Sequence, residues 1–436
     1  MNTLQPGLAV RTLAVEALAA IFERSVSFDD FVDAHDGVKA LQPRDRAFLM
    51  ILVLTALRHK GEIDTVVSGF LAKPLPRKSG TAAWILLTGA AQLLFLDAAP
   101  HAVIDLAVRL AKQDHDATHF SGLINAVLRK IAVEGKAKLA GAGGSGFNTP
   151  QWLWSRWADA YGIDIAHAIA RANALEPPLD ISVKDNPDLW AQRLDGEVLP
   201  TGTVRIANPK GAVDALPGFD EGSWWVQDAA AAIPAKLFGD AAGKSALDLC
   251  AAPGGKTLQL AVAGASVTAV DSSAARLERL RDNLKRTSLE ATIITGDMLA
   301  IDIADLFDCV LLDAPCSATG TLRRHPDLPF LKTSAQIDGL ATLQRKLLRK
   351  AASLVKPGGC LVYCTCSLEP NEGENQITAF LKADEDFTVK PVVPGEAGIE
   401  SHFVTAAGYF RSLPFMTVGK SSGLDGFFAA RLTRSF

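Results

Sequence analysis

The sequence has few of the features that mark a secreted, disulfide-stabilised or membrane protein. It has only 6 cysteines in 436 residues, all of them after residue 249 and none in a Cys-x-x-Cys pair. Neither a disulfide scaffold nor a zinc site is therefore expected. Arg11 and Glu16 interrupt the first apolar stretch, which argues against a secretory signal. The mostly apolar run 47–57 is shorter than the roughly 20 residues that cross a bilayer. We expect a cytoplasmic protein that binds neither a metal nor a membrane.

The sequence also lacks a strong excess of charge of either sign. The net charge is −4 and the pI is about 6.1, so any contact with nucleic acid has to come from local basic patches. In residues 1–150, Lys and Arg outnumber Asp and Glu by 16 to 14. Basic clusters in this part form either a solvated helix face or an RNA-binding face; they comprise Arg44 and Arg46, then Arg58, His59 and Lys60, then Lys73, Arg77 and Lys78.

The chain length and the 48% of hydrophobic residues predict two or three domains with buried cores. Residues 1–135 have apolar residues at helical spacing and predict an all-helical bundle. The glycine-rich stretch 136–147 predicts a flexible linker. Residues 148–235 predict a small α+β domain. Residues 236–436 alternate between strands and helices, which predicts an α/β domain with a mainly parallel sheet.

The segment 246–257 reads ALDLCAAPGGKT. A short apolar run, a turn of small residues and a helix form the first unit of a doubly wound sheet. The small residues let the backbone approach a ligand, and the helix start offers unpaired N–H groups. Asp271 closes a second apolar strand about 20 residues later, where an acid binds a ribose hydroxyl. Cys250 and Ala252 stand where a dinucleotide enzyme has glycines, so we expect a different nucleoside cofactor.

Polar residues also end the later strands of this domain. Asp297, Asp313 and Cys366 each follow a predicted strand, and ligands bind at the carboxyl ends of parallel strands. Cys316 follows Asp313 closely, so both cysteines should converge on one edge of the sheet. A cysteine in such a place can act as a thiolate nucleophile. Three other cysteines are interpreted as small buried residues: Cys309, Cys360 and Cys364. Cys250 lies in the small-residue loop, where its size matters more than its sulfur.

Three long segments resemble the RsmB/Sun family of RNA 5-methylcytosine methyltransferases: ALDLCAAPGGKT, Phe307–Asp327 and Leu354–Asn375. The front resembles the family's NusB-like domain in three stretches: Arg44–Arg46, Leu86–Asp97 and Asn125–Arg129. The resemblance covers nearly the whole chain and is weakest between about 160 and 220. It implies a multidomain protein with an all-α NusB-like N-terminal bundle, a small α+β middle domain that contacts RNA, and an α/β Rossmann-like class I methyltransferase domain.

The same resemblance assigns roles residue by residue. It implies that S-adenosylmethionine is the cofactor, with Asp271 on its ribose, Asp297 near its adenine and Asp313 between cofactor and target base. Cys366 resembles the family's nucleophile, and Cys316 the cysteine that helps to release the product. The implied cofactor loop comprises Cys250, Ala251, Ala252, Pro253, Gly254, Gly255 and Lys256. The sequence departs from the family pattern at Ala318, where a glycine is usual, and at Ser182 and Lys184, where arginine and asparagine are usual.

The chemistry of cytosine methylation requires such groups independently. Addition of a thiolate to carbon 6 makes carbon 5 able to attack a methyl group, and a group near N3, assigned to Asp313, stabilises the developing charge. A base then removes the carbon 5 proton, a stage that suits Cys316 or a water. The base must leave its stack, so an unpaired cytosine is expected.

The implied partner is RNA, with small-subunit ribosomal RNA favoured and transfer RNA as the alternative, and the protein is expected to be a monomer. Two other classes stay open. In a DNA cytosine methyltransferase, Cys316 would be the nucleophile. A non-catalytic, antitermination-like RNA-binding protein would have lost the loop or the cysteines. The second cysteine, Cys366, and the helical front domain favour an RNA methyltransferase.

Overall fold

The computed structural model describes residues 7–141 and 145–436. The chain forms two compact units, of which unit 1 comprises Met1–Leu175 with Leu322–Thr333, and unit 2 comprises Glu176–Thr321 with Ser334–Phe436. Among the described residues, no helix combines the length and the apolar character needed to cross a membrane.

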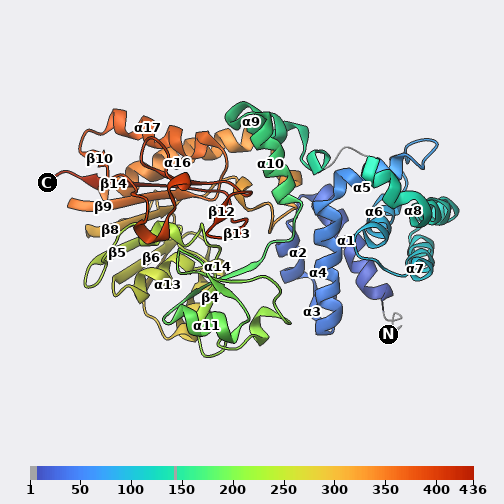
Figure 1. Cartoon of the computed structure of the whole chain (residues 1–436), viewed down its shortest axis with the longest axis horizontal. Coiled ribbons are helices and arrows are strands. Elements are labelled where there is room, and N and C mark those ends of the chain that lie inside the picture. Colours follow the sequence, from blue (N-terminus) through green and yellow to red (C-terminus); the bar gives the residue numbers. More distant parts are fainter. Residues whose placement is uncertain (1–6, 142–144) are drawn as a thin grey trace. The chain divides into compact units, whose positions relative to one another are not determined.

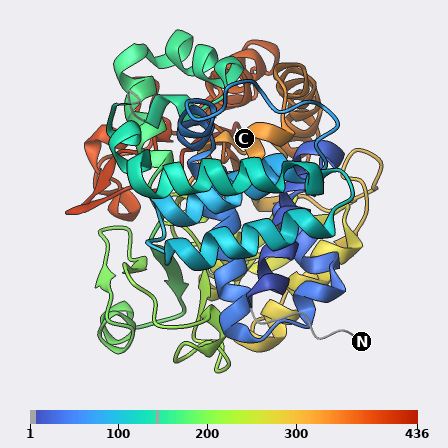
Figure 2. The same ribbon diagram turned by 90° about the vertical axis from the view of Figure 1, so that its right-hand side faces the viewer.

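Unit 1 is helical. Its central helix α6 is apolar on all sides and almost wholly buried, as expected of a core helix. Helices α6, α7 and α8 pack side by side (Figure 2), so closely that a Cβ atom on Gly89 of α6 would lie 2.8 Å from Leu128 of α8. The helices of unit 1 are α1 (Leu8–Arg24), α2 (Phe28–Ala34), α3 (Asp36–Lys39), α4 (Pro43–Arg58), α5 (Lys60–Ser68), α6 (Ala82–Leu94), α7 (Pro100–Gln113), α8 (Ser121–Gly141), α9 (Gln151–Tyr161), α10 (Ile163–Asn173) and α15 (Leu328–Leu331), with the 3-10 turns η1 (Ala117–Phe120) and η2 (Ser145–Asn148).

The predicted linker 136–147 is wrong over its first part, because α8 continues to Gly141. The helix packs tightly on α6 through Gly135, where a Cβ atom would lie 2.8 Å from Leu94. Residues 142–144 of the predicted linker lie outside the described residues. The structure also divides the chain differently at residue 148, since α9 and α10 belong to unit 1. Asn148 contributes to this by exchanging hydrogen bonds with Glu62, at 3.0 and 2.9 Å.

The segment Leu322–Thr333 also belongs to unit 1, although it lies far along the sequence. Arg58 donates a hydrogen bond to the carbonyl of Arg323 at 2.9 Å. The carboxylate of Asp327 accepts from the backbone N–H of Phe28 at 2.9 Å and so satisfies a group near the start of α2. The segment is therefore held by long-range contacts that sequence periodicity does not reveal.

One predicted basic cluster of unit 1 is not available as an RNA-binding face. Arg58 is buried, and its guanidinium donates a hydrogen bond to the carbonyl of Arg323. Lys60 forms an ion pair with Asp64. The ring of His59 bonds to Glu62 at 2.8 Å. The remaining clusters are exposed; they comprise Arg44, Arg46, Lys73, Arg77 and Lys78.

Unit 2 begins with a small antiparallel sheet of strand order β2-β3-β1-β4. Its core contains Ile181, Trp190 and Trp224. Ser182 is buried in β1, and Lys184 donates to the carbonyl of Thr287 at 2.6 Å, so both atypical residues have internal roles. The elements are β1 (Leu179–Val183), α11 (Pro187–Arg193), β2 (Glu197–Val198), β3 (Val204–Ile206), η3 (Val213–Ala215) and β4 (Trp224–Val226).

The rest of unit 2 contains the large sheet, with strand order β10-β14-β9-β8-β5-β6-β7 and β11 paired with β14. The run β9-β8-β5-β6-β7 is parallel, which confirms the predicted α/β fold. Helices α16 and α17 cover one face, and α13 and α14 cover the other (Figure 1). The antiparallel β10, β11 and β14 were not predicted. The strands that follow β5 in the sequence are added first on one side of it, as β6 and β7, and then on the other side, as β8 and β9. Doubly wound sheets bind ligands at the point where the strand order reverses in this way.

The bounds of these elements are α12 (Ile233–Lys236), β5 (Ser245–Leu249), α13 (Gly255–Val262), β6 (Ser266–Asp271), α14 (Ala274–Thr287), β7 (Thr292–Thr295), β8 (Phe307–Asp313), η4 (Thr319–Thr321), α16 (Ser334–Ser353), β9 (Val355–Thr365), η5 (Pro370–Glu372), α17 (Glu374–Ala383), β10 (Phe387–Val389), η6 (Glu396–Gly398), η7 (Ser401–Phe403), β11 (Phe410–Ser412), β12 (Thr417–Val418), β13 (Ser421–Ser422) and β14 (Phe427–Arg434).

Candidate active site

The small-residue loop 250–254 links β5 to α13 at the carboxyl edge of the sheet. Gly254 has φ = 109°, and a Cβ atom there would lie 2.2 Å from a methyl carbon of Leu280, so the position requires glycine. Cys250 also has a positive φ, of 61°. Burial, aided by the charges of Asp313 and Asp271, raises the pKa of Cys250 to about 12. Cys250 is therefore a thiol at neutral pH and a structural part of the loop.

Asp271 lies at the end of β6 with its carboxylate against this loop. The carboxylate accepts hydrogen bonds from the backbone N–H of Ala252 at 3.2 Å and of Ser273 at 2.9 Å, and from Arg276 at 2.8 Å. Asp297 follows β7, is exposed to solvent and accepts from its own turn, at Leu299 N, at 2.9 Å. Asp271 and Asp297 thus lie at the carboxyl ends of neighbouring strands, on the same edge of the sheet as the loop 250–254.

Asp313 ends β8 and is paired with Lys256 of α13, with 2.7 Å between Nζ and Oδ2. Burial, the largest single effect, lowers the pKa of Lys256, but the charges of Asp313, Cys364 and Asp248 and the hydrogen bond to Asp313 together outweigh it, and the pKa of Lys256 is raised. The thiol of Cys364 donates to the other carboxylate oxygen of Asp313 at 3.4 Å. The interpretation of Cys364 as only a small buried residue is therefore incomplete, because its thiol faces a site residue.

The two predicted catalytic cysteines lie together, with 3.5 Å between the sulfur atoms of Cys316 and Cys366. The N–H of Gly320 donates to the carbonyl of Cys366 at 3.0 Å, so the loop after β8 is tied to the end of β9. Ala318, in the same loop, has φ = 58°, a left-handed conformation that favours the glycine expected there. The hydrogen bond to Cys366 and burial, with the charges of Cys366 and Glu372, raise the pKa of Cys316.

Sequence reasoning missed two buried acids, one near Asp313 and Lys256 and the other next to the cysteine loops. Asp248 in β5 accepts from the hydroxyl of Thr257 at 2.6 Å, and burial raises its pKa to about 7. Its only local signal is an acid within the apolar run ALDL. Glu372 is fully buried and accepts from Ser317 N at 2.9 Å. Glu372 lies in a family-like segment, but nothing in its local pattern indicates burial beside the cysteines.

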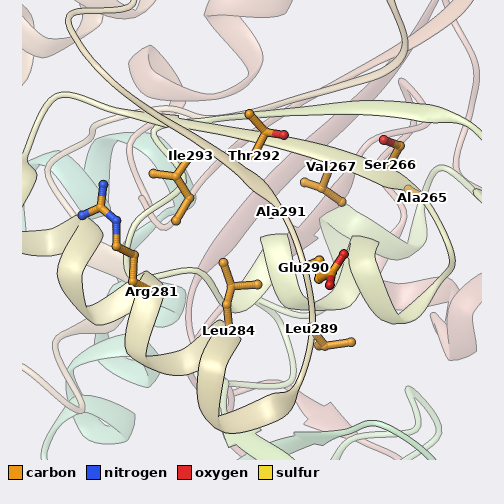
Figure 3. A pocket seen from close by; sticks show the side chains of 10 residues that line it. All are labelled: Ala265, Ser266, Val267, Arg281, Leu284, Leu289, Glu290, Ala291, Thr292 and Ile293. Atoms are coloured by element: carbon orange, nitrogen blue, oxygen red, sulfur yellow. The ribbon is translucent and has the colours of Figure 1, made fainter.

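A separate hollow of about 610 Å³ lies away from this edge (Figure 3). It is lined by the first residues of β6 and β7, such as Ser266 and Thr292, and by Arg281 and Leu284 of α14. The amino ends of the strands therefore form this hollow, whereas all predicted site residues lie at or beyond the carboxyl ends.

Comparison with known proteins connects this geometry with a family. The profile of the 16S rRNA methyltransferase RsmB/F family matches residues 238–433, and that of the NusB family matches residues 8–133. The ribosomal RNA small subunit methyltransferase B of Cronobacter sakazakii is 33% identical to this chain, over 99% of this chain and 100% of that protein. The chain belongs to the RsmB/F family of 16S rRNA methyltransferases.

Solved structures agree with the fold of this RsmB/F-family protein. The structure of the protein PH0851 has a TM-score of 0.74 at 24% identity, covering 98% of this chain and 99% of that chain. A methyltransferase homologue from Pyrococcus horikoshii has a TM-score of 0.55 at 26% identity, covering 68% and 98%.

As an RsmB/F-family member, the protein is an S-adenosylmethionine-dependent RNA methyltransferase. The residues at the carboxyl edge fit this cofactor. The loop brings backbone close to the edge without a side chain at Gly254, and the carboxylate of Asp271 lies against the loop at Ala252. Such an acid beside a small-residue loop is the usual environment of a ribose.

Proposed function

We propose that this protein methylates carbon 5 of an unpaired cytosine in 16S ribosomal RNA through a covalent adduct with Cys366. The observation that carries the proposal is the distance of 3.5 Å between the sulfur atoms of Cys316 and Cys366. Two facing thiols suit a reaction that needs attack at carbon 6 and proton removal at the adjacent carbon 5. The relative in Cronobacter sakazakii, named as a small-subunit ribosomal RNA methyltransferase, supports 16S rRNA as the substrate.

The cofactor is proposed to lie along the loop Cys250–Lys256, with Asp271 on its ribose and Asp297 towards its adenine. S-adenosylmethionine supplies the methyl group as an electrophile. Asp313, held by Lys256 at 2.7 Å, would face both the cofactor and the target base. The contact of Asp271 with the loop at Ala252, at 3.2 Å, supports this arrangement.

The covalent chemistry then depends on the two cysteines. The thiolate of Cys366 forms a bond to carbon 6 of cytosine, and the electron pair of the 5,6 double bond moves towards carbon 5 and N3. Asp313 gives a proton to N3 as the pair arrives. Carbon 5 then takes the methyl group with that electron pair, and the proton on N3 returns to Asp313. When the carbon 5 proton is removed, its bonding pair restores the double bond and expels the Cys366 thiolate.

We assign this last stage to Cys316, as the base or as the group that holds a water acting as base. Its raised pKa, caused first by the hydrogen bond to Cys366 and then by burial, supports the assignment. A thiol of raised pKa supplies little thiolate for the attack, and in its protonated form it serves the release by holding the water that accepts the carbon 5 proton.

Bisulfite sequencing of total RNA from cells with and without the gene tests the proposal. We expect the loss of one 5-methylcytosine in small-subunit ribosomal RNA when the gene is deleted. A lost site in transfer RNA would reassign the substrate, and unchanged 5-methylcytosine in all RNA would refute cytosine methylation.

A further inference from the structure

A buried carboxylate joins the two loops that carry the cysteines. The side chain of Glu372, in η5, has no exposed surface. It accepts hydrogen bonds from the N–H of Ser317 at 2.9 Å and from the hydroxyls of Ser317 and Ser367. Ser317 directly follows Cys316, and Ser367 directly follows Cys366. One carboxylate therefore holds the residue next to each sulfur.

Neighbouring side chains fix Glu372 in this position. The amide of Gln344 in α16 donates to Glu372 at 3.1 Å and to the carbonyl of Pro315, before Cys316, at 2.9 Å. The hydroxyl of Tyr363 in β9 donates to the backbone carbonyl of Glu372 at 2.7 Å. The carboxylate of Glu372 is thus attached to α16 and to both cysteine loops, and its backbone is attached to β9.

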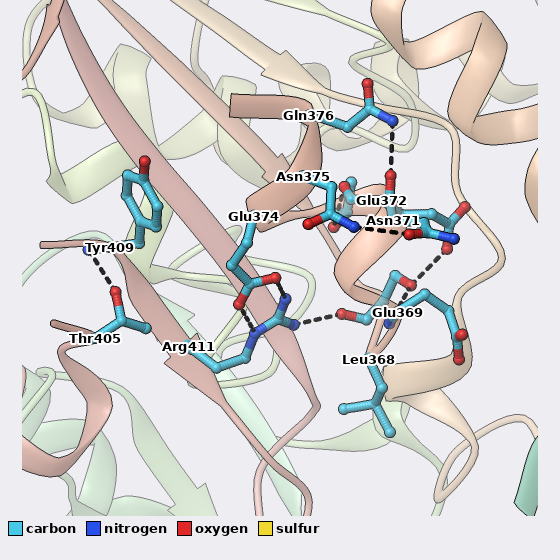
Figure 4. Close-up of polar contacts among 12 residues, drawn as sticks. Leu368, Glu369, Asn371, Glu372, Glu374, Asn375, Gln376, Thr405, Tyr409 and Arg411 are labelled. Carbon is cyan, nitrogen blue, oxygen red and sulfur yellow. Dashed lines mark hydrogen bonds and ion pairs between the residues drawn. The ribbon is translucent and has the colours of Figure 1, made fainter. Parts of the chain in front are cut away.

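An ion pair, between Arg411 and Glu374, also supports the Cys366 loop. Arg411 of β11 binds both carboxylate oxygens of Glu374, at 3.0 and 2.6 Å (Figure 4). The same guanidinium donates to the carbonyl of Ser367 at 2.6 Å. Ser367 is therefore held through its hydroxyl by Glu372 and through its carbonyl by Arg411.

The cost of burying a carboxylate shows what these contacts achieve. A charge removed from water destabilises the folded state unless hydrogen bonds replace its hydration. At Glu372 the replacement comes from Ser317, Ser367 and Gln344. The carboxylate stays satisfied only while both cysteine loops keep their positions, so displacing either loop leaves a buried acceptor without its donors.

We propose that Glu372 is a positioning residue that keeps the sulfur atoms of Cys316 and Cys366 facing each other for attack and release. This role rests on the proposed cytosine chemistry and assigns Glu372 no contact with substrate. The 3.5 Å between the sulfur atoms is the geometry that the carboxylate maintains.

The charge of Glu372 has a second effect on the pair. After the hydrogen bond to Cys366, burial and the charge of Cys366, the charge of Glu372 contributes to the raised pKa of Cys316. Glu372 therefore both places Cys316 and favours its protonated form, which leaves the attack to Cys366.

The test uses the full-length protein with Glu372→Gln, which keeps the shape of the side chain and removes the charge and one acceptor. Glu396→Gln is the matched control, because Glu396 pairs with Arg431 and bonds to neither serine. We measure kcat and KM for 16S rRNA methylation, the Kd of S-adenosylmethionine and the pH profile of Cys316 alkylation by iodoacetamide, read by mass spectrometry. A fourth readout is the rate of the Cys316–Cys366 disulfide formed with diamide, whose N=N bond takes the two thiol protons and two electrons.

For Glu372→Gln we expect kcat to fall on the order of 100-fold, as displaced reacting groups do, with cofactor Kd within about twofold of wild type. Disulfide formation should slow when the variant and the wild type are compared at pH values that give Cys316 the same thiolate fraction. Cys316 alkylation should move to lower pH because the charge that raises its pKa is gone. Wild-type kcat with an unchanged disulfide rate would overturn the proposal. If Glu372→Gln does not fold, the double variant Ser317→Ala with Ser367→Ala removes both hydroxyl donors. Wild-type kcat in that folded variant would equally overturn the proposal.

The two proposals fail separately. A wild-type protein that makes no 5-methylcytosine refutes the proposed function, whereas the disulfide rate and the Cys316 alkylation profile need no RNA. If both of these readouts change in Glu372→Gln and neither changes in Glu396→Gln, the positioning role stands whatever the substrate.

Discussion

Replacing the two cysteines one at a time distinguishes the attacking sulfur from the releasing one. In Cys366→Ala the hydrogen bond and charge of Cys366 are lost, but burial and the charge of Glu372 still raise the pKa of Cys316. Cys316 therefore remains a poor source of the missing thiolate. In Cys316→Ala the attacking sulfur remains, and the group 3.5 Å away that serves the release is gone.

The pKa of Cys316 sets the size of the expected effect. An ordinary thiol is only a few per cent thiolate at pH 7, and each unit of raised pKa lowers that fraction about tenfold. We expect Cys366→Ala to retain less than about 1% of the wild-type methylation rate and to form no adduct. Cys316→Ala should transfer methyl and then stall, so that a protein–RNA adduct accumulates.

The assay is denaturing gel electrophoresis after incubation with S-adenosylmethionine and 16S rRNA, with radiolabelled methyl groups marking the adduct. Cys309→Ala, at a buried cysteine near the start of β8, is the control and should behave as wild type. An adduct in Cys366→Ala that is absent from Cys316→Ala would refute the reasoning and support the order of the DNA-type enzymes.

Three further predictions concern stability, cofactor and RNA. Burial raises the pKa of Asp248 from 3.8 to about 7, so the folded state holds this proton more tightly than the unfolded state does. The free energy of unfolding should therefore fall by on the order of 4 kcal/mol as the pH rises from the lower to the higher of these values. Thermal unfolding at pH 5 and pH 8 should show a smaller loss for Asp248→Asn than for wild type; an equal loss would contradict the assignment. Asp271→Ala should weaken S-adenosylmethionine binding by about 1–3 kcal/mol, and unchanged affinity by calorimetry in the folded variant would exclude Asp271 from the site. Charge reversal of the exposed residues Lys73, Arg77 and Lys78 should weaken RNA binding in filter-binding assays and flatten its salt dependence, while cofactor affinity stays intact. Unaffected RNA binding would mean that these residues form only a solvated face.

Local patterns predicted the parts of the molecule that short-range interactions specify. The parallel strands and their order of appearance follow from apolar runs with turns between them, because adjacent residues decide strand, turn and helix starts. The loop Cys250–Lys256 and the acids Asp271 and Asp313 could be placed at one edge since parallel strands share a carboxyl edge.

Contacts between distant segments account for the predictions that were wrong or missing. The linker 136–147 looked flexible by its glycines, yet α8 extends to Gly141, and Gly135 of the same helix packs on Leu94. Arg58 looked like a solvent-facing cation, but the carbonyl of Arg323, 265 residues away, occupies it. The sequence around Gly135 does not indicate the contact with Leu94, and the sequence around Arg58 does not indicate the contact with Arg323.

The sequence by itself determined the candidate reactive groups and the edge of the sheet where they lie: two cysteines, an acid proposed to face the base and an acid proposed to bind the ribose. The tertiary structure alone decided that the sulfur atoms of Cys316 and Cys366 face each other, and that Glu372 holds them so. The physical reason is that Ser317 and Glu372, 55 residues apart, meet only after β8, β9 and α16 have packed. A buried carboxylate is stable only where such distant donors converge on it.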